Sequence, residues 1–113
     1  MEKLDMSLYI ALKVPDGYSF FKFDEIVRFE AIQKRTLVYM IYSDKPIKLL
    51  NCMTDIVNKL SSHKEFFKCH RSHIVSLVHI EKYIKKQRIL VTNNGNASIA
   101  KVHTKRFEES YCK

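Results

Sequence analysis

The side chains best suited to chemistry lie close together between positions 65 and 83, in the run EFFKCHRSHIVSLVHIEKY. The basic and imidazole groups there can donate hydrogen bonds to an anion or to a base edge. They are Lys68, His70, Arg71, His73 and His79. The interleaved apolar residues are expected to anchor the segment in a core, and they are Phe66, Phe67, Ile74, Val75, Leu77, Val78 and Ile80. This mixture indicates binding rather than catalysis.

A nucleophile or a metal site is the catalytic interpretation of Cys69, His70 and His73. Consecutive side chains of a strand point to opposite faces, so Cys69 and His70 are poorly placed to act on one atom. A zinc site needs three or four ligands at a recognisable spacing, and the chain has no Cys-x-x-Cys pair. The two glycines, Gly17 and Gly95, stand in separate turn signals and form no nucleotide fingerprint. We therefore expect no enzymatic activity, no cofactor and no metal, with Cys69 as buried scaffold.

Polar and cationic residues instead gather in three expected loops. The first holds Gln33, Lys34 and Arg35, the second holds His70, Arg71, Ser72 and His73, and the third runs from Asn94 to Lys101 with Lys105 and Arg106 nearby. If a β scaffold brings these loops to one edge, their donors could span several phosphates and reach into a groove. Arginine suits guanine through two parallel hydrogen bonds, whereas lysine and serine suit phosphate oxygens. The pattern favours nucleic-acid binding over a basic protein-interaction module.

Charge supports the same partner. The chain carries 20 Lys and Arg against 12 Asp and Glu, a net charge of +8, and its pI is about 9.5. The first 30 residues hold four basic and six acidic side chains, a balance of −2, which leaves +10 for the remainder. A basic surface suits a polyanion, although it also suits simple solubility. An RNA-binding module would add exposed aromatics, for which Tyr18 and Tyr83 are candidates.

Length and composition set the broad class. At 113 residues the chain fits one domain spanning positions 1–113, and 46% hydrophobic residues is an ordinary globular share. No apolar run approaches the roughly 18 residues of a membrane-spanning helix. The alternating charges of positions 1–5 do not resemble a secretory signal. Because the three cysteines are odd in number and unpatterned, we expect reduced thiols and a cytoplasmic location.

The elements that must position these loops are mostly strands. Positions 6–14 and 19–23 read as a hairpin around the turn signal Pro15-Asp16-Gly17. Further strands are expected from about 26 to 31, from 36 to 42 and from 46 to 50, with the basic interruption at positions 33–35. Later strands flank the turns at 85–88 and 93–96, and positions 97–101 are the expected return strand.

One central helix interrupts the strands. Met53, Ile56, Val57 and Leu60 follow a helical spacing, and Asn51 is the expected N-cap. Positions 103–111 predict a short C-terminal helix. The predicted fold is therefore mostly β, an elongated antiparallel sheet or sandwich of short strands with one central helix and a short helix at the end.

The run from Phe67 to Leu77, FKCHRSHIVSL, continues into His79-Ile80 and resembles the signature of LytTR-type DNA-binding domains. That signature has phenylalanine, a basic residue, a short spacer, His-Arg-Ser, an aromatic, Ile-Val-Asn and a following His-Ile. Positions 24–31, 50–60 and 94–101 resemble the early strand, the helix and the closing hairpin of the family. The similarity covers nearly the whole chain.

The resemblance implies a bacterial transcription regulator that binds double-stranded promoter DNA through loops, often as two copies on direct repeats. A receiver domain commonly accompanies such domains, and none is present in this chain. By position, residues 33–35, Arg71 and Ala100-Lys101 match the contact regions of the family. We expect Arg71 to read bases. His70 could donate to a phosphate or brace its loop from within, and bracing is the favoured role.

Three residues depart from the family pattern. Ser76 replaces the usual asparagine, His73 the usual aromatic, and Ala100-Lys101 the usual Ser-Arg. Lysine keeps the charge but lacks the bidentate fork of arginine. Lys101 is therefore expected to contact phosphate more readily than bases.

Overall fold

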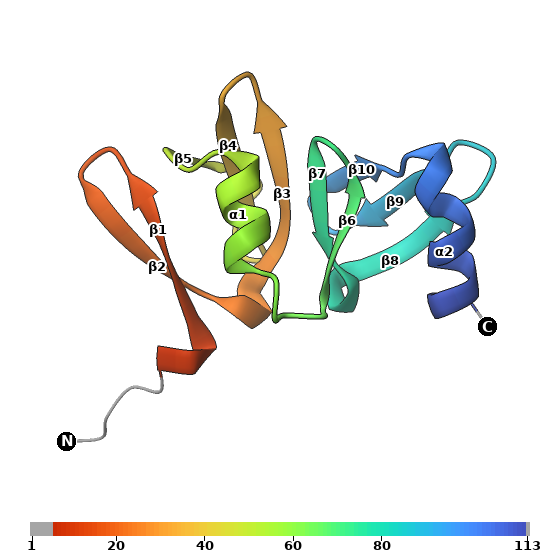
Figure 1. The fold of residues 1–113 in the computed structure, drawn as a ribbon, viewed down its shortest axis with the longest axis horizontal. Helices are drawn as coiled ribbons and strands as arrows, with labels where there is room; N and C mark the ends of the chain where they lie inside the picture. The colour runs from red at the N-terminus through yellow and green to blue at the C-terminus, as the bar shows by residue number, and fades with distance from the viewer. Residues whose placement is uncertain (1–5, 113) are drawn as a thin grey trace.

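Three antiparallel sheets follow one another along the molecule (Figure 1). The computed structural model describes residues 6–112, so the expectations for positions 1–5 lie outside the described residues. The first sheet pairs β1 (Tyr9–Val14) with β2 (Gly17–Lys22). The second has the order β5-β4-β3-β7-β6, and its strands are β3 (Ile26–Ile32), β4 (Arg35–Met40), β5 (Ile47–Leu49), β6 (Phe66–His70) and β7 (His73–Ser76). The third has the order β10-β9-β8, and its strands are β8 (Ile80–Ile84), β9 (Ile89–Thr92) and β10 (Gly95–Ser98).

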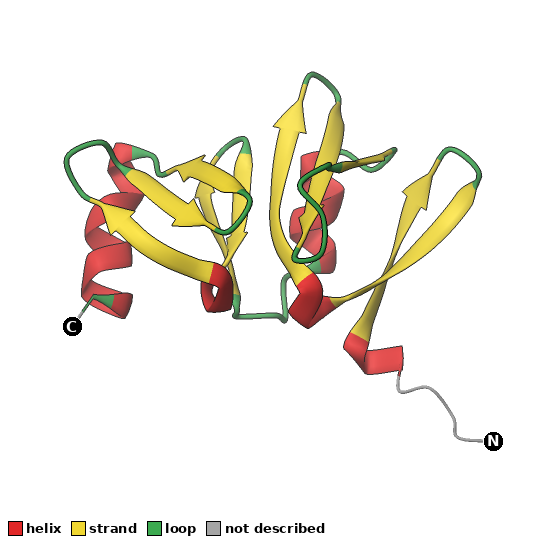
Figure 2. Ribbon diagram, turned by 180° about the vertical axis from the view of Figure 1, so that it is seen from behind, coloured by secondary structure: helices red, strands yellow, loops and turns green. Residues whose placement is uncertain are grey.

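Within residues 6–112, two α-helices accompany the sheets. Helix α1 (Met53–Lys59) follows β5, and helix α2 (Lys101–Tyr111) follows β10 (Figure 2). Short 3-10 helices span Met6–Leu8, Phe23–Glu25 and Leu77–His79. The molecule measures 48 × 33 × 25 Å. The predicted fold class, an elongated and mostly antiparallel β structure with a central and a C-terminal helix, is confirmed.

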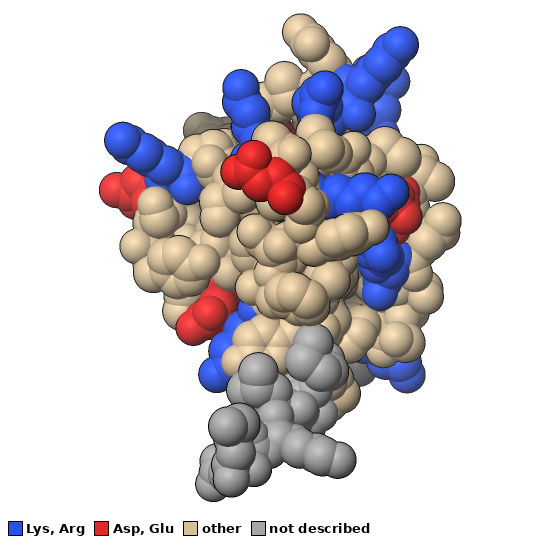
Figure 3. Space-filling view, turned by 90° about the vertical axis from the view of Figure 1, so that its left-hand side faces the viewer, with Lys and Arg blue, Asp and Glu red and all other residues tan. Residues whose placement is uncertain are grey.

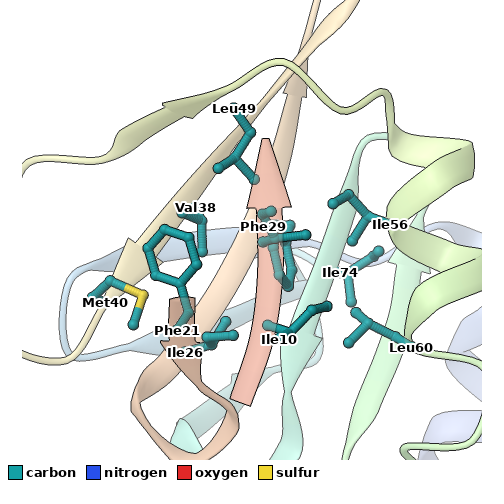
Figure 4. Close-up of a cluster of buried hydrophobic side chains, with 11 residues drawn as sticks. Ile10, Phe21, Ile26, Phe29, Val38, Met40, Leu49, Ile56, Leu60 and Ile74 are labelled. Carbon is teal, nitrogen blue, oxygen red and sulfur yellow. The ribbon is translucent and has the colours of Figure 1, made fainter. Parts of the chain in front are cut away.

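The first hydrophobic core lies between the β1–β2 hairpin, one face of the five-stranded sheet and α1 (Figure 4). Strand β1 alternates inward and outward residues, which places Ile10 and Leu12 in this core. Phe29 from β3 and Ile56 from α1 are fully buried there. The apolar stripe of α1 therefore has the role that its helical spacing predicts.

The second core lies between strands β6 and β7, the third sheet and α2. Ile74 and Val75 are consecutive on β7, and they enter the first and the second core respectively. Phe67 packs against Phe107 of α2, with ring centroids 5.6 Å apart. Strand β7 is thus a shared wall, and the basic residues just before it are held by packing on both sides.

A buried arginine joins the second sheet to the third. Arg28 on β3 is 5% exposed, and its guanidinium carbon lies 3.7 Å from the ring centroid of Tyr39. Its Nη2 donates to the carbonyl oxygen of Asn94 at 3.5 Å, and the Asn94 side-chain amide donates to the carbonyl oxygen of Met40 at 3.0 Å. These contacts attach the β9–β10 turn to the centre of the molecule.

Two expectations for local structure were wrong around α1 and β10. Cys52, not Asn51, is the N-cap of α1, because Asn51 Oδ1 accepts a hydrogen bond from the backbone N–H of Lys13 at 2.8 Å and its amide donates to Asp55. The return strand ends at Ser98 rather than continuing to Lys101.

Other boundaries also differ from the sequence prediction. The first strand begins at Tyr9, since Met6–Leu8 forms a 3-10 turn, and Arg35 is the first residue of β4 rather than part of the loop. Val78 is 68% exposed, so it does not anchor the segment. The 3-10 turn at Leu77–His79 takes Val78 out of the strand alternation that predicted its burial.

Candidate nucleic-acid interface

Turns and the start of α2 form one long edge of the molecule, uppermost in Figure 1. It carries the β3–β4 turn at Gln33-Lys34, the β6–β7 turn at Arg71-Ser72, the β8–β9 turn at positions 85–88 and the first residues of α2. We call it the loop edge. The opposite edge holds the connection from α1 to β6 and the 3-10 turns that precede β3 and β8 (Figures 1 and 2).

The first region of the loop edge is the tip of the β3–β4 hairpin. Gln33 adopts a positive φ of 57°, which closes the two-residue turn. Gln33, Lys34 and Arg35 are all exposed. Ile32 pairs with Arg35 across the ladder, so the hairpin extends these polar side chains from a rigid two-stranded base.

The second region is the β6–β7 turn. Arg71 is exposed, and the backbone N–H of Ser72 donates to His70 Nδ1 at 3.1 Å. The carbonyl oxygen of Ser72 accepts from the backbone N–H of Ala31 at 2.8 Å, which ties this turn to the first region. The bond to Nδ1 is the brace expected of His70, and it leaves Arg71 free to project.

His73 contributes less exposed surface than its neighbours. It is half-buried, its ring lies 5.5 Å from that of His70, and burial lowers the pKa of its imidazole. Its Nδ1 has no hydrogen-bond partner among the described residues. The neutral ring is therefore better placed to support the turn than to meet a phosphate.

The third region is the start of α2. Lys101 is exposed and is the first residue of the helix, after Ala100, whose backbone N–H donates to the carbonyl oxygen of Cys69 at 2.7 Å. Lys105 is also exposed, but it lies one turn further along α2 and its Nζ is 4.0 Å from Glu109 Oε1. Lys101 therefore belongs to the loop edge, whereas Lys105 lies at its margin.

Most cations on the loop edge have no acidic partner within the described chain, and Lys85, which pairs with Glu108, is an exception. Among residues 6–112 the ion pairs are His63–Glu65, Lys85–Glu108 and Lys105–Glu109. Lys34, Arg35, Arg71 and Lys101 take part in none of them. Figure 3, which views the molecule from the end with the β1–β2 hairpin, shows Lys and Arg side chains projecting from the upper edge. Such a row can neutralise successive phosphates.

Cys69 is scaffold rather than a nucleophile. It is fully buried, its Sγ donates to the carbonyl oxygen of His73 at 3.8 Å, and burial raises the pKa of its thiol to about 12. A thiol of that pKa stays protonated at neutral pH. No group of three or more His, Cys, Asp or Glu side chains that could hold a metal ion occurs in the described part of the chain.

Exposed aromatic side chains are found away from the three regions. Tyr18 and Phe20 on β2 are 62% and 59% exposed. Tyr83 is half-buried, and its hydroxyl donates a hydrogen bond to Glu108 Oε2 at 2.7 Å. Burial together with that bond raises the pKa of the Tyr83 hydroxyl to about 12. Of the two aromatic candidates named from the sequence, Tyr18 alone is exposed.

Sequence reasoning missed Gln87 and Arg88 as parts of the loop edge. With His70, Ala100 and Lys101 they line an open cleft of about 350 Å³. The basic turn at positions 85–88 was visible in the sequence, but its position beside α2 was not. Arg88 has a positive φ of 53°, a conformation that the sequence does not reveal for an arginine.

The family model of the LytTr DNA-binding domain matches residues 16–111. The chain belongs to the LytTR family. LytTR domains are DNA-binding output domains of response regulators rather than catalytic domains, and the matched residues include all three regions just described.

A solved structure agrees with this fold. The LytTr DNA-binding domain of a response regulator from Bacillus cereus has a TM-score of 0.70 and 23% sequence identity, covering 89% of this chain and 94% of its own. A comparison with curated protein sequences gave no match. Within residues 6–112 of this LytTR domain, neither helix has the length and apolar character needed to cross a membrane.

Proposed function

We propose that this LytTR domain binds double-stranded promoter DNA in a sequence-specific manner through its loop edge. The observation that carries the proposal is the pair of backbone hydrogen bonds that join the three basic regions. Ala31 to Ser72 joins the first region to the second, and Ala100 to Cys69 joins the second to the third. Donors fixed in one row suit the regular spacing of a DNA backbone.

The size of the molecule suits a duplex. Its long axis of 48 Å, which includes the β1–β2 hairpin as well as the loop edge, corresponds to about 14 base pairs at about 3.4 Å per base pair, somewhat more than one helical turn. Contact regions separated along this axis can reach successive grooves on one side of the DNA. Turns make up most of this edge and α2 reaches it only with its first residues, so we expect short loops rather than a recognition helix to enter the grooves.

Each side chain has a proposed role. Arg71, exposed at the tip of the second region, reads bases through its bidentate fork. Gln33 contributes a side-chain amide from the first region. Phosphate contacts and support of the turns come from the remaining proposed residues: Lys34, Arg35, His70, Ser72, His73, Lys101 and Lys105.

Selection of bound sequences from a random duplex pool tests the function directly. A recurring motif is expected, and fluorescence anisotropy on that motif should show affinity falling steeply as salt rises. An affinity that does not change with salt would contradict binding through phosphates. A pool that yields no enriched motif would contradict sequence specificity while leaving non-specific DNA binding.

Larger assembly forms part of the proposal. We expect the chain to act in the cytoplasm as one DNA-binding unit over positions 1–113, and two copies to bind repeated sites. A receiver domain or a sensor outside residues 1–113, either in a longer form of this protein or on a partner, would provide the upstream signal. The spacing of repeats in the selected sequences, together with the mass of the protein–DNA complex, tests paired binding.

A basic RNA-binding or protein-interaction module is the second candidate. The exposure of Tyr18 and Phe20 on β2 favours it, because exposed rings can stack on unpaired bases. Competition between duplex DNA and single-stranded RNA distinguishes the two. Preference for the RNA, together with its loss in the Tyr18→Ala variant, would support this candidate over promoter binding.

A further inference from the structure

A polar cleft opens on the loop edge where the β8–β9 turn, the end of β6 and the start of α2 meet. Its volume is about 350 Å³, and no carboxylate lines it. The lining residues are His70, Gln87, Arg88, Ser98, Ile99, Ala100 and Lys101. We propose that this cleft seats one phosphodiester of the DNA backbone, with Arg88 as its principal ligand. The proposal rests on the proposed function and adds the β8–β9 turn to the three regions as a fourth contact.

The walls of the cleft are fixed by backbone hydrogen bonds. Ile99 N–H donates to the carbonyl oxygen of Arg88 at 2.8 Å, and Ala100 N–H donates to that of Cys69 at 2.7 Å. The Arg88 backbone N–H donates in turn to the carbonyl oxygen of Lys85 at 3.2 Å. Three segments distant in sequence are thus joined before any ligand arrives. A preformed site loses little entropy on binding.

One wall presents an imidazole with a defined donor. His70 Nδ1 accepts the backbone N–H of Ser72 at 3.1 Å, so in the neutral ring the hydrogen lies on Nε2. His70 lines the cleft, and Nε2–H is a donor suited to a phosphate oxygen. The same side chain therefore braces the Arg71 turn through one nitrogen and offers the other to an anion.

The positive charge of the cleft is available to a ligand. Arg88 and Lys101 are exposed and form no ion pair among the described residues. Lys85, in the same turn as Arg88, differs because its Nζ lies 3.3 Å from Glu108 Oε1. Ala100, the N-cap of α2, has no side-chain cap, so the first N–H groups of the helix add to the positive potential beside the two cations.

The test combines an arginine variant with a chemically neutralised DNA backbone. Arg88→Gly removes the side chain and suits the positive φ, and Lys86→Ala is the matched control, an exposed lysine of the same turn that does not line the cleft. We expect Arg88→Gly to lower the affinity for the selected and for the random duplex alike, by about tenfold. The slope of log affinity against log salt concentration should become shallower by roughly 0.9. Arg88→Lys should restore part of the affinity.

A scan of single methylphosphonate substitutions then locates the phosphate. One neutralised position should weaken the wild-type complex yet leave the Arg88→Gly complex unchanged. The inference is overturned if Arg88→Gly behaves like Lys86→Ala, or if every methylphosphonate penalty persists in Arg88→Gly. If Arg71→Ala still weakens binding in either case, promoter binding stands without the cleft. Absence of duplex binding by the wild type overturns both.

Discussion

Replacing Arg71 by alanine separates base reading from general attraction to DNA. Arg71 is exposed in a two-residue turn, and its side chain forms no hydrogen bond, ion pair or aromatic contact among the described residues. Its loss should therefore change the free energy of unfolding by no more than about 0.5 kcal/mol. Any larger effect on DNA binding then reports on the complex and not on the fold.

The magnitude follows from the role proposed for the guanidinium. A bidentate arginine–guanine pair contributes about 1 to 3 kcal/mol of discrimination, which corresponds to roughly a 5- to 150-fold weaker complex with the selected site. On random duplex the same change removes only a cation near the backbone. The ratio of the two affinities should therefore fall, which is a change that loss of a phosphate contact cannot produce.

Fluorescence anisotropy on the selected and a random duplex, at several salt concentrations, measures both affinities. Lys64→Ala is the matched control, because it also removes one exposed positive charge but lies in the connection from α1 to β6, on the edge opposite the loops (Figure 1). Equal losses on the two duplexes for Arg71→Ala would refute base reading. A loss as large for Lys64→Ala would refute the loop edge as the contact surface.

Three further predictions concern the scaffold. Gly95→Ala should lower the free energy of unfolding, measured by chemical denaturation, by at least about 1 to 3 kcal/mol and by more than Gly17→Ala does. Both glycines have a strongly positive φ, but a Cβ at Gly95 would lie 2.7 Å from Arg28 Nη2, whereas no atom lies within 4 Å of a Cβ at Gly17. Equal losses of stability in the two variants would contradict a clash at Gly95. Thiol labelling near neutral pH should modify the exposed Cys52 and Cys112 and spare Cys69 until the protein unfolds, because burial raises the pKa of the Cys69 thiol to about 12. Rapid labelling of Cys69 in the folded protein would be inconsistent with its burial. Because burial lowers the pKa of His73 in the folded protein, the His73 imidazole of the unfolded chain is protonated first as the pH falls, and the free energy of unfolding should decline through about pH 6.5. Chemical denaturation at several pH values should show a smaller decline for the His73→Gln variant. An identical decline in the variant would assign the effect to another group.

Local patterns in the sequence determined the type of most elements. The alternation around Ile10 and Leu12 predicted a strand with one buried face, and the spacing of Met53, Ile56 and Leu60 predicted α1. Both signals come from neighbours within a few residues, which is the range over which backbone periodicity acts. The family resemblance of the Arg71 segment was readable for the same reason, since its motif is contiguous.

Tertiary structure decided where several of these elements end. Asn51 has the chemistry of an N-cap, but its Oδ1 is occupied by the N–H of Lys13, 38 residues away in the chain. Beyond Ser98 the chain leaves β9: Ile99 N–H still donates to the carbonyl oxygen of Arg88, which faces it in the β9–β10 register, but Ala100 N–H donates to Cys69 of β6 instead. Competition from distant partners is invisible to local propensity, so it set boundaries that the sequence could not predict.

The candidate interface divides in the same way. The positions of basic residues along the sequence were enough to identify the three basic regions, because charge is a property of each residue. Their common edge, and the cleft that brings Arg88 beside His70 and Lys101, depend on backbone hydrogen bonds between segments far apart in sequence. The sequence by itself determined which side chains could meet an anion, whereas only the packed sheets decided which of them meet it together.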